Sequence, residues 1–527
     1  MILRTSYPRE RITSDALPTL HRFKFNERYF VLMLCCLAAL RVFIYSAAFP
    51  FFNNVDEGAH FDLVLKYFHG LVPHKLEPAS AETPNYIKLY GSLEYLKPPQ
   101  TSPSAMSEKQ RPNSIYDYPP NSEALKAKAA ILWGIGPESL NHESSQPPLY
   151  YVAAALWMRL GHLFGLTGGG LLYWVRFLNV FIAAALVWIG FVAASLIFPQ
   201  DRFMRLGVPL LLTALPQDIF YSIQNDVLSP VFFGIAFIEL ILWSRSDVPS
   251  AKLGLCTGLS LAAAYLNKVS SLPLIVVAAV ALLIQAWRLS RTGKLRAATP
   301  AFTLLLISAG LPIISLSAWN IYHFGDVTGS GPKIKLLGWT LRPISQWLIH
   351  PIFTLRGFSY FWSELMSSFW RGEFVWGMKR LAFAPADAFY WISSIVLLSA
   401  ALIGLFPRFS LASKPQRDAL WLALGSFVAS VAYLALLSIV FDYGGCTYPS
   451  RAFPYLTSGR LLAGTLIPFF IVYLYGLKWI ARQVKGEGLL WWILGGMVAL
   501  MAGSQIAVDR VVFASQWNWF HLVMGFG

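Results

Sequence analysis

The chain has 527 residues, of which 56% are hydrophobic and only 13% are charged, and its mean hydropathy is +0.52. Soluble domains carry about 25% charged residues, so this composition excludes an ordinary soluble enzyme and a disordered chain. The net charge of +15 would by itself suit a nucleic-acid partner, and the four cysteines lack the spacing of disulfide frameworks or metal sites. Apolar runs long enough to cross about 30 Å of hydrocarbon recur, so the sequence predicts an all-α polytopic membrane protein.

The first apolar run covers residues 29–51 and follows a basic segment, 1–28. A secretory signal peptide has a shorter apolar region nearer the N-terminus, so we interpret this run as an uncleaved anchor whose basic flank stays in the cytoplasm. Further candidate spans follow at 172–198, 206–224, 229–244, 253–267, 270–287, 300–322, 388–406, 419–441, 460–478 and 489–507. The sequence thus predicts about 11 transmembrane helices, within a range of 11–13.

One apolar stretch, 149–164, decides the orientation of everything that follows it. It contains Arg159 and His162, and it is short for a span. If it lies along the outer surface, the basic connections all fall on the cytoplasmic side with the N-terminus, as the positive-inside rule requires; they are 199–205, 245–252, 288–299, 407–418 and 478–488. We therefore expect a juxtamembrane helix at 149–164 and an extracytoplasmic C-terminus. The basic residues then face anionic lipid, and no nucleic-acid partner is expected.

This topology divides the chain into four parts. They are a cytoplasmic N-terminal segment 1–28, a transmembrane module 29–322 that includes an outer loop 51–147, a second outer loop 323–386, and C-terminal transmembrane helices 387–527. Both loops are expected on the extracytoplasmic face. Loops of this length are usually functional or disordered, and the aromatic residues of the second suit the lipid headgroups.

The first group of residues that suggests chemistry directly follows the first span. Asp56 and Glu57 are adjacent acids, and a helical turn there would place His60 on the same face. A carboxylate near lipid and near another acid tends to have a raised pKa, which suits a general base. The alternative is a plain helix N-terminus, where acids interact favourably with the helix dipole.

Other ionisable residues lie in or beside the spans. Arg41 and Glu239 fall in span interiors, where charge is costly, and we expect them to form a structural pair. Several more fall at the predicted outer ends, where some could simply snorkel to the interface. We expect these outer residues to gather in one cavity that holds a phosphate-bearing lipid and activates an acceptor; with the acids above, they are Arg176, Asp226, Lys268 and Arg460.

Five short motifs resemble, in this order, those of the GT-C superfamily of membrane glycosyltransferases, which includes protein O-mannosyltransferases and aminoarabinose transferases. Val55-Asp-Glu57 resembles their acidic motif, and Gln146-Pro-Pro-Leu-Tyr-Tyr151 resembles their His/Gln-Pro-Pro-Leu motif. Arg176-Phe-Leu-Asn179 is similar to the Arg that opens their next span. Asn225-Asp226 and Ser458-Gly-Arg-Leu-Leu462 are most similar to a poorly characterised bacterial branch, in which Tyr stands where this chain has Leu461.

The resemblance implies a GT-C-like helical bundle and an inverting transferase that moves a sugar from a polyprenyl-phosphate carrier to an acceptor on the extracytoplasmic face. Asp56, with Glu57, matches the catalytic acids, and the lipid phosphate would be met by Arg460, Lys268 and Arg176. Further candidate site residues are His60, Asn225, Asp226, Gln146 and Tyr150. No cofactor is required by the resemblance; a divalent metal at Asp56 and Asp226 is left open because relatives differ.

Rival functions are left open by the sequence. Intramembrane ionisable residues also mark transporters and flippases of lipid-linked sugars, although no duplicated halves are evident. A lipid-linked polysaccharide polymerase or ligase and a non-catalytic scaffold are further alternatives. The acceptor can be a glycan, a lipid or a protein, and membrane lipid is a partner in each case. The expected location is the plasma (inner) membrane of a bacterium.

Overall fold

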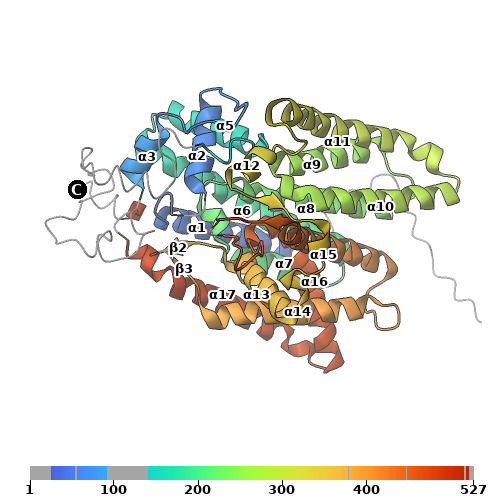
Figure 1. The fold of residues 1–527 in the computed structure, drawn as a ribbon. Coiled ribbons are helices and arrows are strands. Elements are labelled where there is room, and N and C mark those ends of the chain that lie inside the picture. Colours follow the sequence, from blue (N-terminus) through green and yellow to red (C-terminus); the bar gives the residue numbers. More distant parts are fainter. Residues whose placement is uncertain are drawn as a thin grey trace, which may run out of the picture.

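The structure is a computed structural model, and it describes residues 25–53, 56–91, 140–377, 379–446, 448–515 and 518–520. It is an all-α bundle in which most helices run alongside one another (Figure 1). The sheet structure consists of two short antiparallel ladders, β1 (Thr340–Leu341) with β4 (Phe441–Asp442) and β2 (Val375–Trp376) with β3 (Lys379–Arg380). The predicted fold class, an all-α polytopic membrane protein, is confirmed. Much of the first outer loop (92–139) and most of segment 1–28 lie outside the described residues.

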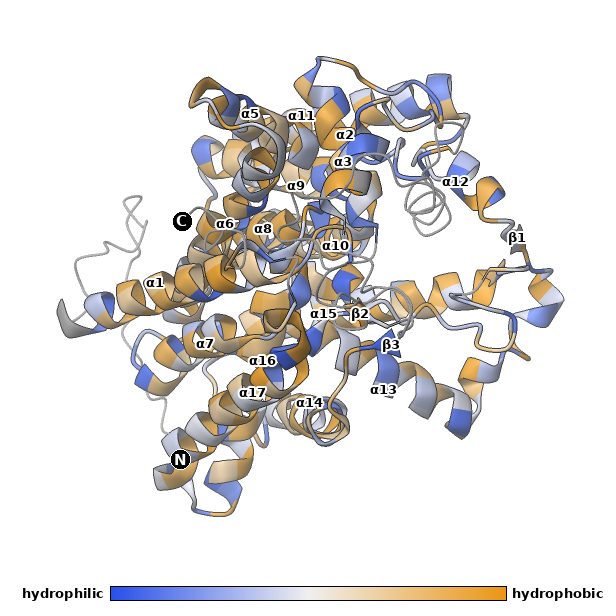
Figure 2. Ribbon diagram, turned by 90° about the vertical axis from the view of Figure 1, so that its left-hand side faces the viewer, coloured by the Kyte–Doolittle hydropathy of each residue, from blue (hydrophilic) through white to orange (hydrophobic). Residues whose placement is uncertain are grey.

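Within the described part of the chain, nine helices are long and apolar enough to cross a membrane. Each corresponds to a predicted span: α1 (Phe25–Ala48), α6 (Gly168–Ile197), α8 (Ser229–Arg245), α10 (Leu272–Arg291), α11 (Leu295–Phe324), α14 (Ala384–Leu405), α15 (Lys414–Val440), α16 (Leu466–Gln483) and α17 (Leu490–Phe513). Hydrophobic residues dominate these helices, and hydrophilic residues are more frequent at their ends and in the connecting segments (Figure 2).

The two remaining predicted spans, 206–224 and 253–267, correspond to helices that are not among these nine. Helix α7 (Arg202–Ala214) has 13 residues, because the chain leaves the helix before Pro216 and continues through short 3-10 turns instead of reaching residue 224. Helix α9 (Ala251–Asn267) has 17 residues. Both pack inside the bundle, α7 against α6 and α16, and α9 against α8 and α11.

The pairing of α9 with α11 depends on glycine. Gly254 and Gly258 lie one helical turn apart, and a Cβ on either would come within about 2 Å of α11, at the Ala301 carbonyl oxygen and the Ser308 hydroxyl. Small residues at this spacing let two membrane helices approach closely, so that backbone atoms make van der Waals contact. Together with Ser308, which donates a hydrogen bond to the Leu255 carbonyl at 3.2 Å, they set this interface.

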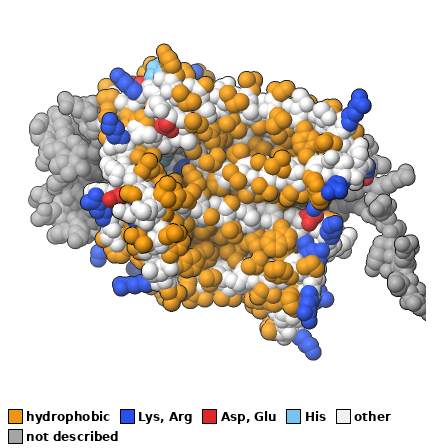
Figure 3. All heavy atoms as spheres, turned by 45° about the vertical axis from the view of Figure 1, so that its right-hand side comes forward, with side chains coloured by type: hydrophobic (Ala, Val, Ile, Leu, Met, Phe, Trp, Pro, Cys, Tyr) orange, Lys and Arg blue, Asp and Glu red, His pale blue; other side chains and the backbone are white. Residues whose placement is uncertain are grey.

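One end of the bundle carries the predicted inner connections. Arg205 contacts Glu27 at 2.8 Å, Lys478 pairs with Asp201, Arg288 pairs with Asp418 at 3.6 Å, and Lys294 pairs with Asp247 at 3.5 Å. The first two contacts join two basic connections to the start of α1, and the last two join the other three to one another. Arg245 donates to the Leu196 carbonyl at 2.6 Å and links the two groups at the same end of the bundle. Figure 3 shows a broad band of hydrophobic side chains between two margins where Lys and Arg gather. The arrangement suits a membrane-embedded belt; which margin faces the cytoplasm stays a prediction.

The other end, which we call the outer end after its predicted location, carries the helices of the two predicted outer segments. They are α2 (Glu57–Phe68), α3 (Thr83–Tyr90), α5 (Leu149–Leu163), α12 (Gly331–Leu336) and α13 (Leu355–Arg371). Helix α5 corresponds to stretch 149–164; it has 15 residues and is not among the nine candidate spans. Trp157 of α5 stacks on Trp174 of α6 with ring centroids 4.4 Å apart, and each indole donates to the other's backbone carbonyl. This contact attaches α5 to the outer end of α6.

The expected pairing of Arg41 with Glu239 is wrong. Arg41 donates to the Tyr221 hydroxyl at 2.5 Å and to Gln505 at 3.3 Å, whereas Glu239 accepts a hydrogen bond from Ser260 of α9. The Arg41 side chain points from α1 toward α17, whereas the Glu239 side chain points from α8 toward α9. Depth along a span does not fix the direction in which a side chain points.

Candidate functional site

Asp56 lies at the outer end of the bundle, at the start of α2. Its backbone is left-handed, with φ of 63°, and its side chain makes no capping hydrogen bond to α2. Instead, Oδ2 contacts Arg460 Nη2 at 2.5 Å and Oδ1 contacts His142 Nε2 at 3.2 Å. The helix-terminus interpretation therefore does not account for this carboxylate. Non-glycine residues held in the left-handed region gather at functional sites.

Arg460 reaches Asp56 from the opposite end of the sequence. It lies in a 3-10 helix (Gly459–Thr465) that precedes α16. Gly459 permits the close approach of this segment to α13, because a Cβ there would lie 2.0 Å from the backbone nitrogen of Phe369. Arg460 also contacts the Gln224 amide oxygen at 3.4 Å and Glu373 Oε2 at 3.9 Å. Only 16% of its side chain is exposed, against 21% for Asp56.

His142 and Glu143 extend the contacts of Asp56 on its other side. His142 Nε2 lies 3.2 Å from Glu143 Oε1, the same distance that separates it from Asp56 Oδ1. Glu143 is buried; its Oε1 accepts from Lys333 of α12 at 2.5 Å and its Oε2 accepts from Gln146 at 2.6 Å. The first outer segment is thereby joined to the second.

These contacts form a continuous row of alternating charges, which we call the charge chain. On the far side of Arg460, Glu373 accepts a hydrogen bond from Ser458 at 2.8 Å and lies 3.9 Å from Arg380. The members in order are Lys333, Glu143, His142, Asp56, Arg460, Glu373 and Arg380. Glu143 and Glu373 are buried, so Asp56 is the acid of the chain with the best access to solvent.

Glu57 and Arg176 make a separate, fully buried pair. Arg176 donates to Glu57 Oε1 at 2.8 Å and Oε2 at 2.7 Å, and to the backbone carbonyls of Ser46, Phe49 and Pro50. These contacts occupy all five guanidinium N–H groups. The backbone N–H groups of Phe52 and Ile223 complete the shell of Glu57. This geometry favours a structural role for both residues, rather than catalysis for Glu57 or phosphate binding for Arg176.

The pair Lys268 and Asp226 is joined to the charge chain through two amides. Lys268 Nζ lies 2.5 Å from Asp226 Oδ1 and 3.3 Å from Asn225 Oδ1. Asn225 donates to the Gln146 side chain at 3.1 Å, and Gln146 donates to Glu143. Four of the six outer-end residues singled out in the sequence thus belong to one polar region, namely Asp56, Asp226, Lys268 and Arg460, and Lys268 is almost wholly buried there. Glu57 and Arg176 stay outside it as a separate pair.

His60 and Tyr150 belong to the packing beneath this region. His60 Nδ1 lies 2.7 Å from the Tyr151 hydroxyl, between α2 and α5. Burial lowers the pKa of His60 to about 4, which keeps its imidazole neutral. Tyr150 is completely buried. Both side chains therefore contribute to the framework that supports Asp56, and Tyr151 is the aromatic residue that contacts the histidine.

The charge chain controls the protonation of its members. Burial alone would raise the pKa of Asp56, but the Arg460 guanidinium and His142 outweigh it and hold this pKa well below its usual range. Burial would lower the pKa of His142, but its contacts with Asp56 and Glu143 raise it to about 9. Lys333 similarly outweighs burial and lowers the pKa of Glu143. At neutral pH Asp56 and Glu143 are therefore carboxylates and His142 is protonated. The raised pKa of Asp56 expected from the sequence is wrong, because its cationic neighbours outweigh burial.

Among the described residues, Asp56, His142 and Glu143 are close enough to share a metal ion, with ligand atoms within 4.8 Å of one another. Asp226, the other acid left open as a metal ligand, is not in this set and pairs with Lys268. The three residues already have cationic or hydrogen-bonding partners in Arg460, Lys333 and the protonated His142. The donor set does not require a metal to balance its charge.

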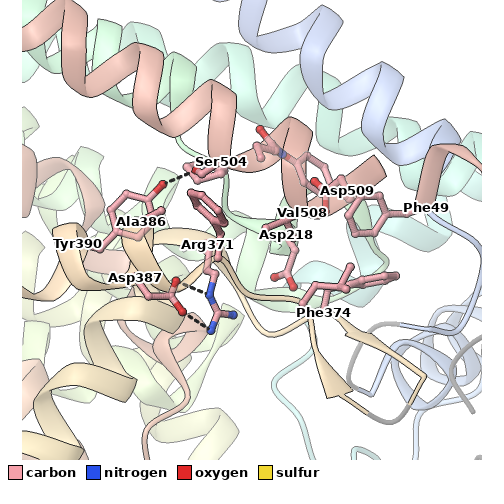
Figure 4. Close-up of a pocket in the computed structure, with 15 residues that line it drawn as sticks. Phe49, Asp218, Arg371, Phe374, Ala386, Asp387, Tyr390, Ser504, Val508 and Asp509 are labelled. Atoms are coloured by element: carbon pink, nitrogen blue, oxygen red, sulfur yellow. Dashed lines mark hydrogen bonds and ion pairs between the residues drawn. The ribbon is translucent and has the colours of Figure 1, made fainter. Parts of the chain in front are cut away.

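Figure 4 shows a small cavity whose lining residue Asp218 contacts Glu373 of the charge chain. It has a volume of about 30 Å³, room for about two water molecules, and is lined by Asp218, Asp509 and the ion pair of Arg371 with Asp387. Asp218 accepts from the backbone N–H of Glu373 at 2.8 Å, so these two residues separate the cavity from Arg460. It is too small for a sugar.

Several residues of this region were not singled out by the sequence: His142, Glu143, Lys333, Glu373 and Arg380. His142 and Glu143 lie close to the Gln146-Pro-Pro motif, which is the one local signal that pointed toward them. Lys333, Glu373 and Arg380 come from the second outer segment, whose irregular sequence carries no motif. Only docking of the two segments against each other identifies them.

A model of a family of predicted membrane proteins, DUF2142, matches residues 39–447. This range includes Asp56, His142 and Lys333 but not Arg460. The match covers more than half of the chain, so the protein belongs to this family. No curated protein and no solved structure matches the chain.

Proposed function

We propose that this member of the DUF2142 family is a membrane glycosyltransferase that moves a sugar from a polyprenyl-phosphate carrier to an acceptor hydroxyl. The observation that carries the proposal is the direct contact of Asp56 with Arg460 at the outer end of the bundle. It places a carboxylate base beside a guanidinium, and the planar fork of arginine suits phosphate oxygens. The GT-C-like order of the motifs agrees with this pairing.

The chemistry divides between the two residues. The acceptor oxygen attacks the anomeric carbon while its proton passes to the Asp56 carboxylate. The bond between the anomeric carbon and the phosphate oxygen breaks, and its electron pair leaves on the carrier phosphate. Arg460 neutralises the charge that develops there. Attack on the face opposite the phosphate inverts the anomeric centre.

The ion pair of the unliganded state implies an order of events. While Arg460 holds Oδ2, Asp56 is a weak base, because its pKa lies well below the usual range. A donor phosphate at Arg460 competes with Asp56 for the same N–H groups. The carboxylate then becomes available to the acceptor only when the donor is in place, which disfavours proton abstraction from water in an empty site.

Arg460 is the principal phosphate-binding residue of the proposal. Arg176 has all its N–H groups occupied, and Lys268 is buried against Asp226. Burial lowers the pKa of Lys268, and its pairing with Asp226 counteracts the shift. We propose that Lys268 contributes positive charge to the site through its contact with Asn225. Arg176 has a structural role in the proposal.

The reaction is proposed for the extracytoplasmic face of a bacterial plasma membrane, with the N-terminus in the cytoplasm. This orientation follows from the basic connections at the other end of the bundle. The alternative functions, a flippase of lipid-linked sugars and a lipid-linked polymerase or ligase, differ in product. A flippase moves its substrate with the sugar–phosphate bond intact, whereas a transferase releases polyprenyl phosphate.

The test uses full-length protein in lipid nanodiscs with undecaprenyl-phosphate hexoses radiolabelled in the sugar and a lipid and glycan extract as acceptor. We expect labelled product and free undecaprenyl phosphate. Asp56→Asn should reduce the rate by about a hundredfold or more, whereas Asp442→Asn, in the exposed pair with Arg451, should not. Unchanged turnover of Asp56→Asn would remove this residue as the base.

A second variant tests the phosphate assignment. Arg460→Ala should raise the KM for the labelled donor more than the KM for the acceptor, with Arg451→Ala as the matched arginine control. Transport of intact labelled donor across proteoliposomes, with no release of undecaprenyl phosphate, would support the flippase and refute the transferase.

A further inference from the structure

We infer that His142 is a positioning residue that fixes the Asp56 carboxylate for proton transfer, and that Glu143 and Lys333 in turn fix His142. The inference rests on the proposed function and assigns roles to three residues that the motifs do not contain. It comes from the contacts of the charge chain alone.

The two carboxylate oxygens of Asp56 have different partners. Oδ1 contacts His142 at 3.2 Å and Oδ2 contacts Arg460 at 2.5 Å. When a donor phosphate takes over Arg460, Oδ2 loses its partner and Oδ1 retains its own. Oδ2 is therefore the oxygen that receives the acceptor proton, and His142 is the contact that survives the exchange.

A second anchor is needed because an aspartate carboxylate rotates easily. The terminal torsion of Asp is broad and roughly two-fold, so a carboxylate held by Arg460 alone would turn freely once that contact is lost. Proton transfer requires the base within hydrogen-bond reach of the hydroxyl in a defined direction. His142 limits the rotation by holding Oδ1.

His142 is itself held by a second carboxylate, which contacts the same ring nitrogen as Asp56 does. Its Nε2 lies 3.2 Å from Glu143 Oε1, and the Glu143 carboxylate is fixed by Lys333 at 2.5 Å and Gln146 at 2.6 Å. Glu143 is buried, so it cannot turn toward a substrate. It acts on the reaction only through His142. Lys333 comes from α12, so the second outer segment contributes to the orientation of a base on the first.

The experiment compares His142→Ala, His142→Gln, Glu143→Gln and the double variant His142→Ala/Glu143→Gln in full-length protein. His69→Gln is the matched control, because His69 also lies 3.2 Å from a glutamate, Glu82, but is exposed and outside the charge chain. The readouts are kcat and KM with undecaprenyl-phosphate hexoses, the pH profile of kcat, and the melting temperature of each variant.

We expect His142→Ala to lower kcat by about a hundredfold, the size of effect that a misplaced group produces, with little change in the donor KM. His142→Gln, which keeps one N–H for Asp56, should recover part of the loss. Glu143→Gln should give a smaller defect that is absent from the His142→Ala background. The acid limb of the kcat profile should move toward higher pH in His142→Ala, since Asp56 loses a cationic neighbour.

The outcomes separate the inference from the proposed function. If the native protein turns over and Asp56→Asn does not, but His142→Ala has normal kcat and pH profile, the positioning role is refuted while the transferase stands. Additive defects of His142→Ala and Glu143→Gln would also refute it. A loss of kcat accompanied by a lower melting temperature in both His142 variants, with no shift of the pH profile, would indicate a merely structural role. No turnover by the native protein refutes both ideas.

Discussion

Replacing Arg176 with methionine should strongly destabilise the folded protein, because its guanidinium joins α6 to the end of α1 and the start of α2. It donates two hydrogen bonds to Glu57 and three to backbone carbonyls between Ser46 and Pro50. Its loss leaves a completely buried carboxylate that keeps, among the described residues, hydrogen bonds from the backbone N–H groups of Phe52 and Ile223. Removing one partner of a buried ion pair costs about 3–5 kcal/mol, and we expect a loss of folding free energy in this range.

Three companion variants test whether this cost comes from the buried ion pair. Glu57→Met should be similarly harmful, because it leaves Arg176 buried without its counter-charge. The double variant Arg176→Met/Glu57→Met should lose less than the sum, by about 2 kcal/mol or more, since apolar residues of similar volume can replace a buried pair. Arg451→Met is the control: its pair with Asp442 has the same chemistry, but 70% of the Arg451 side chain is exposed, and such pairs contribute about 0–1 kcal/mol.

Unfolding can be followed in detergent by a thiol-reactive dye once Cys36, Cys256 and Cys446 are replaced by serine, because Cys35 is buried in the bundle and reacts when the helices separate. Reversible unfolding in mixed micelles with sodium dodecyl sulfate gives the free energies. A melting temperature of Arg176→Met equal to that of the native protein, or an additive double variant, would refute the structural assignment. A stable Arg176→Met that fails to bind undecaprenyl phosphate would restore the phosphate role predicted from the sequence.

Three further predictions concern packing, topology and pH. Gly258→Leu should separate α9 from α11 and lower the melting temperature, whereas Gly425→Leu, at a helix position where a Cβ meets no neighbour, should have little effect. A reporter fused after Phe164 should report an extracytoplasmic location; a cytoplasmic signal would mean that 149–164 crosses. The pKa of His142 is raised on folding to about 9 from about 6.5, so its stabilisation is complete below about pH 6.5 and is lost as the pH rises through 9. The native melting temperature should therefore fall more steeply over this range than that of His142→Gln, and parallel curves would contradict the shift.

The transmembrane part of the fold was accessible from the sequence because hydrophobic length is a local property. Nine of the predicted spans coincide with helices long and apolar enough to cross. The exception within 206–224 arises from Pro216, where the backbone leaves the α region and the chain forms 3-10 turns. The turn nevertheless brings Gln224, Asn225 and Asp226 to the outer end.

The candidate site was only partly accessible. Residues beside a span end, such as Asp56 and Arg460, can be placed at one face from topology alone, and the structure joins them. The orientation of side chains within the bundle cannot be obtained this way, which explains the wrong pairing of Arg41 with Glu239. The partners Glu143 and Lys333 lie 190 positions apart in irregular segments, and nothing periodic in the sequence relates them.

Asp56 and Arg460 are separated by 404 positions along the sequence. In the proposed orientation the carboxylate is translocated with the first loop, whereas the guanidinium is translated only after most of the helices. A nascent chain therefore lacks the pair throughout most of its assembly. The proposed reaction therefore cannot begin until translation has passed Arg460 and the last helices have docked.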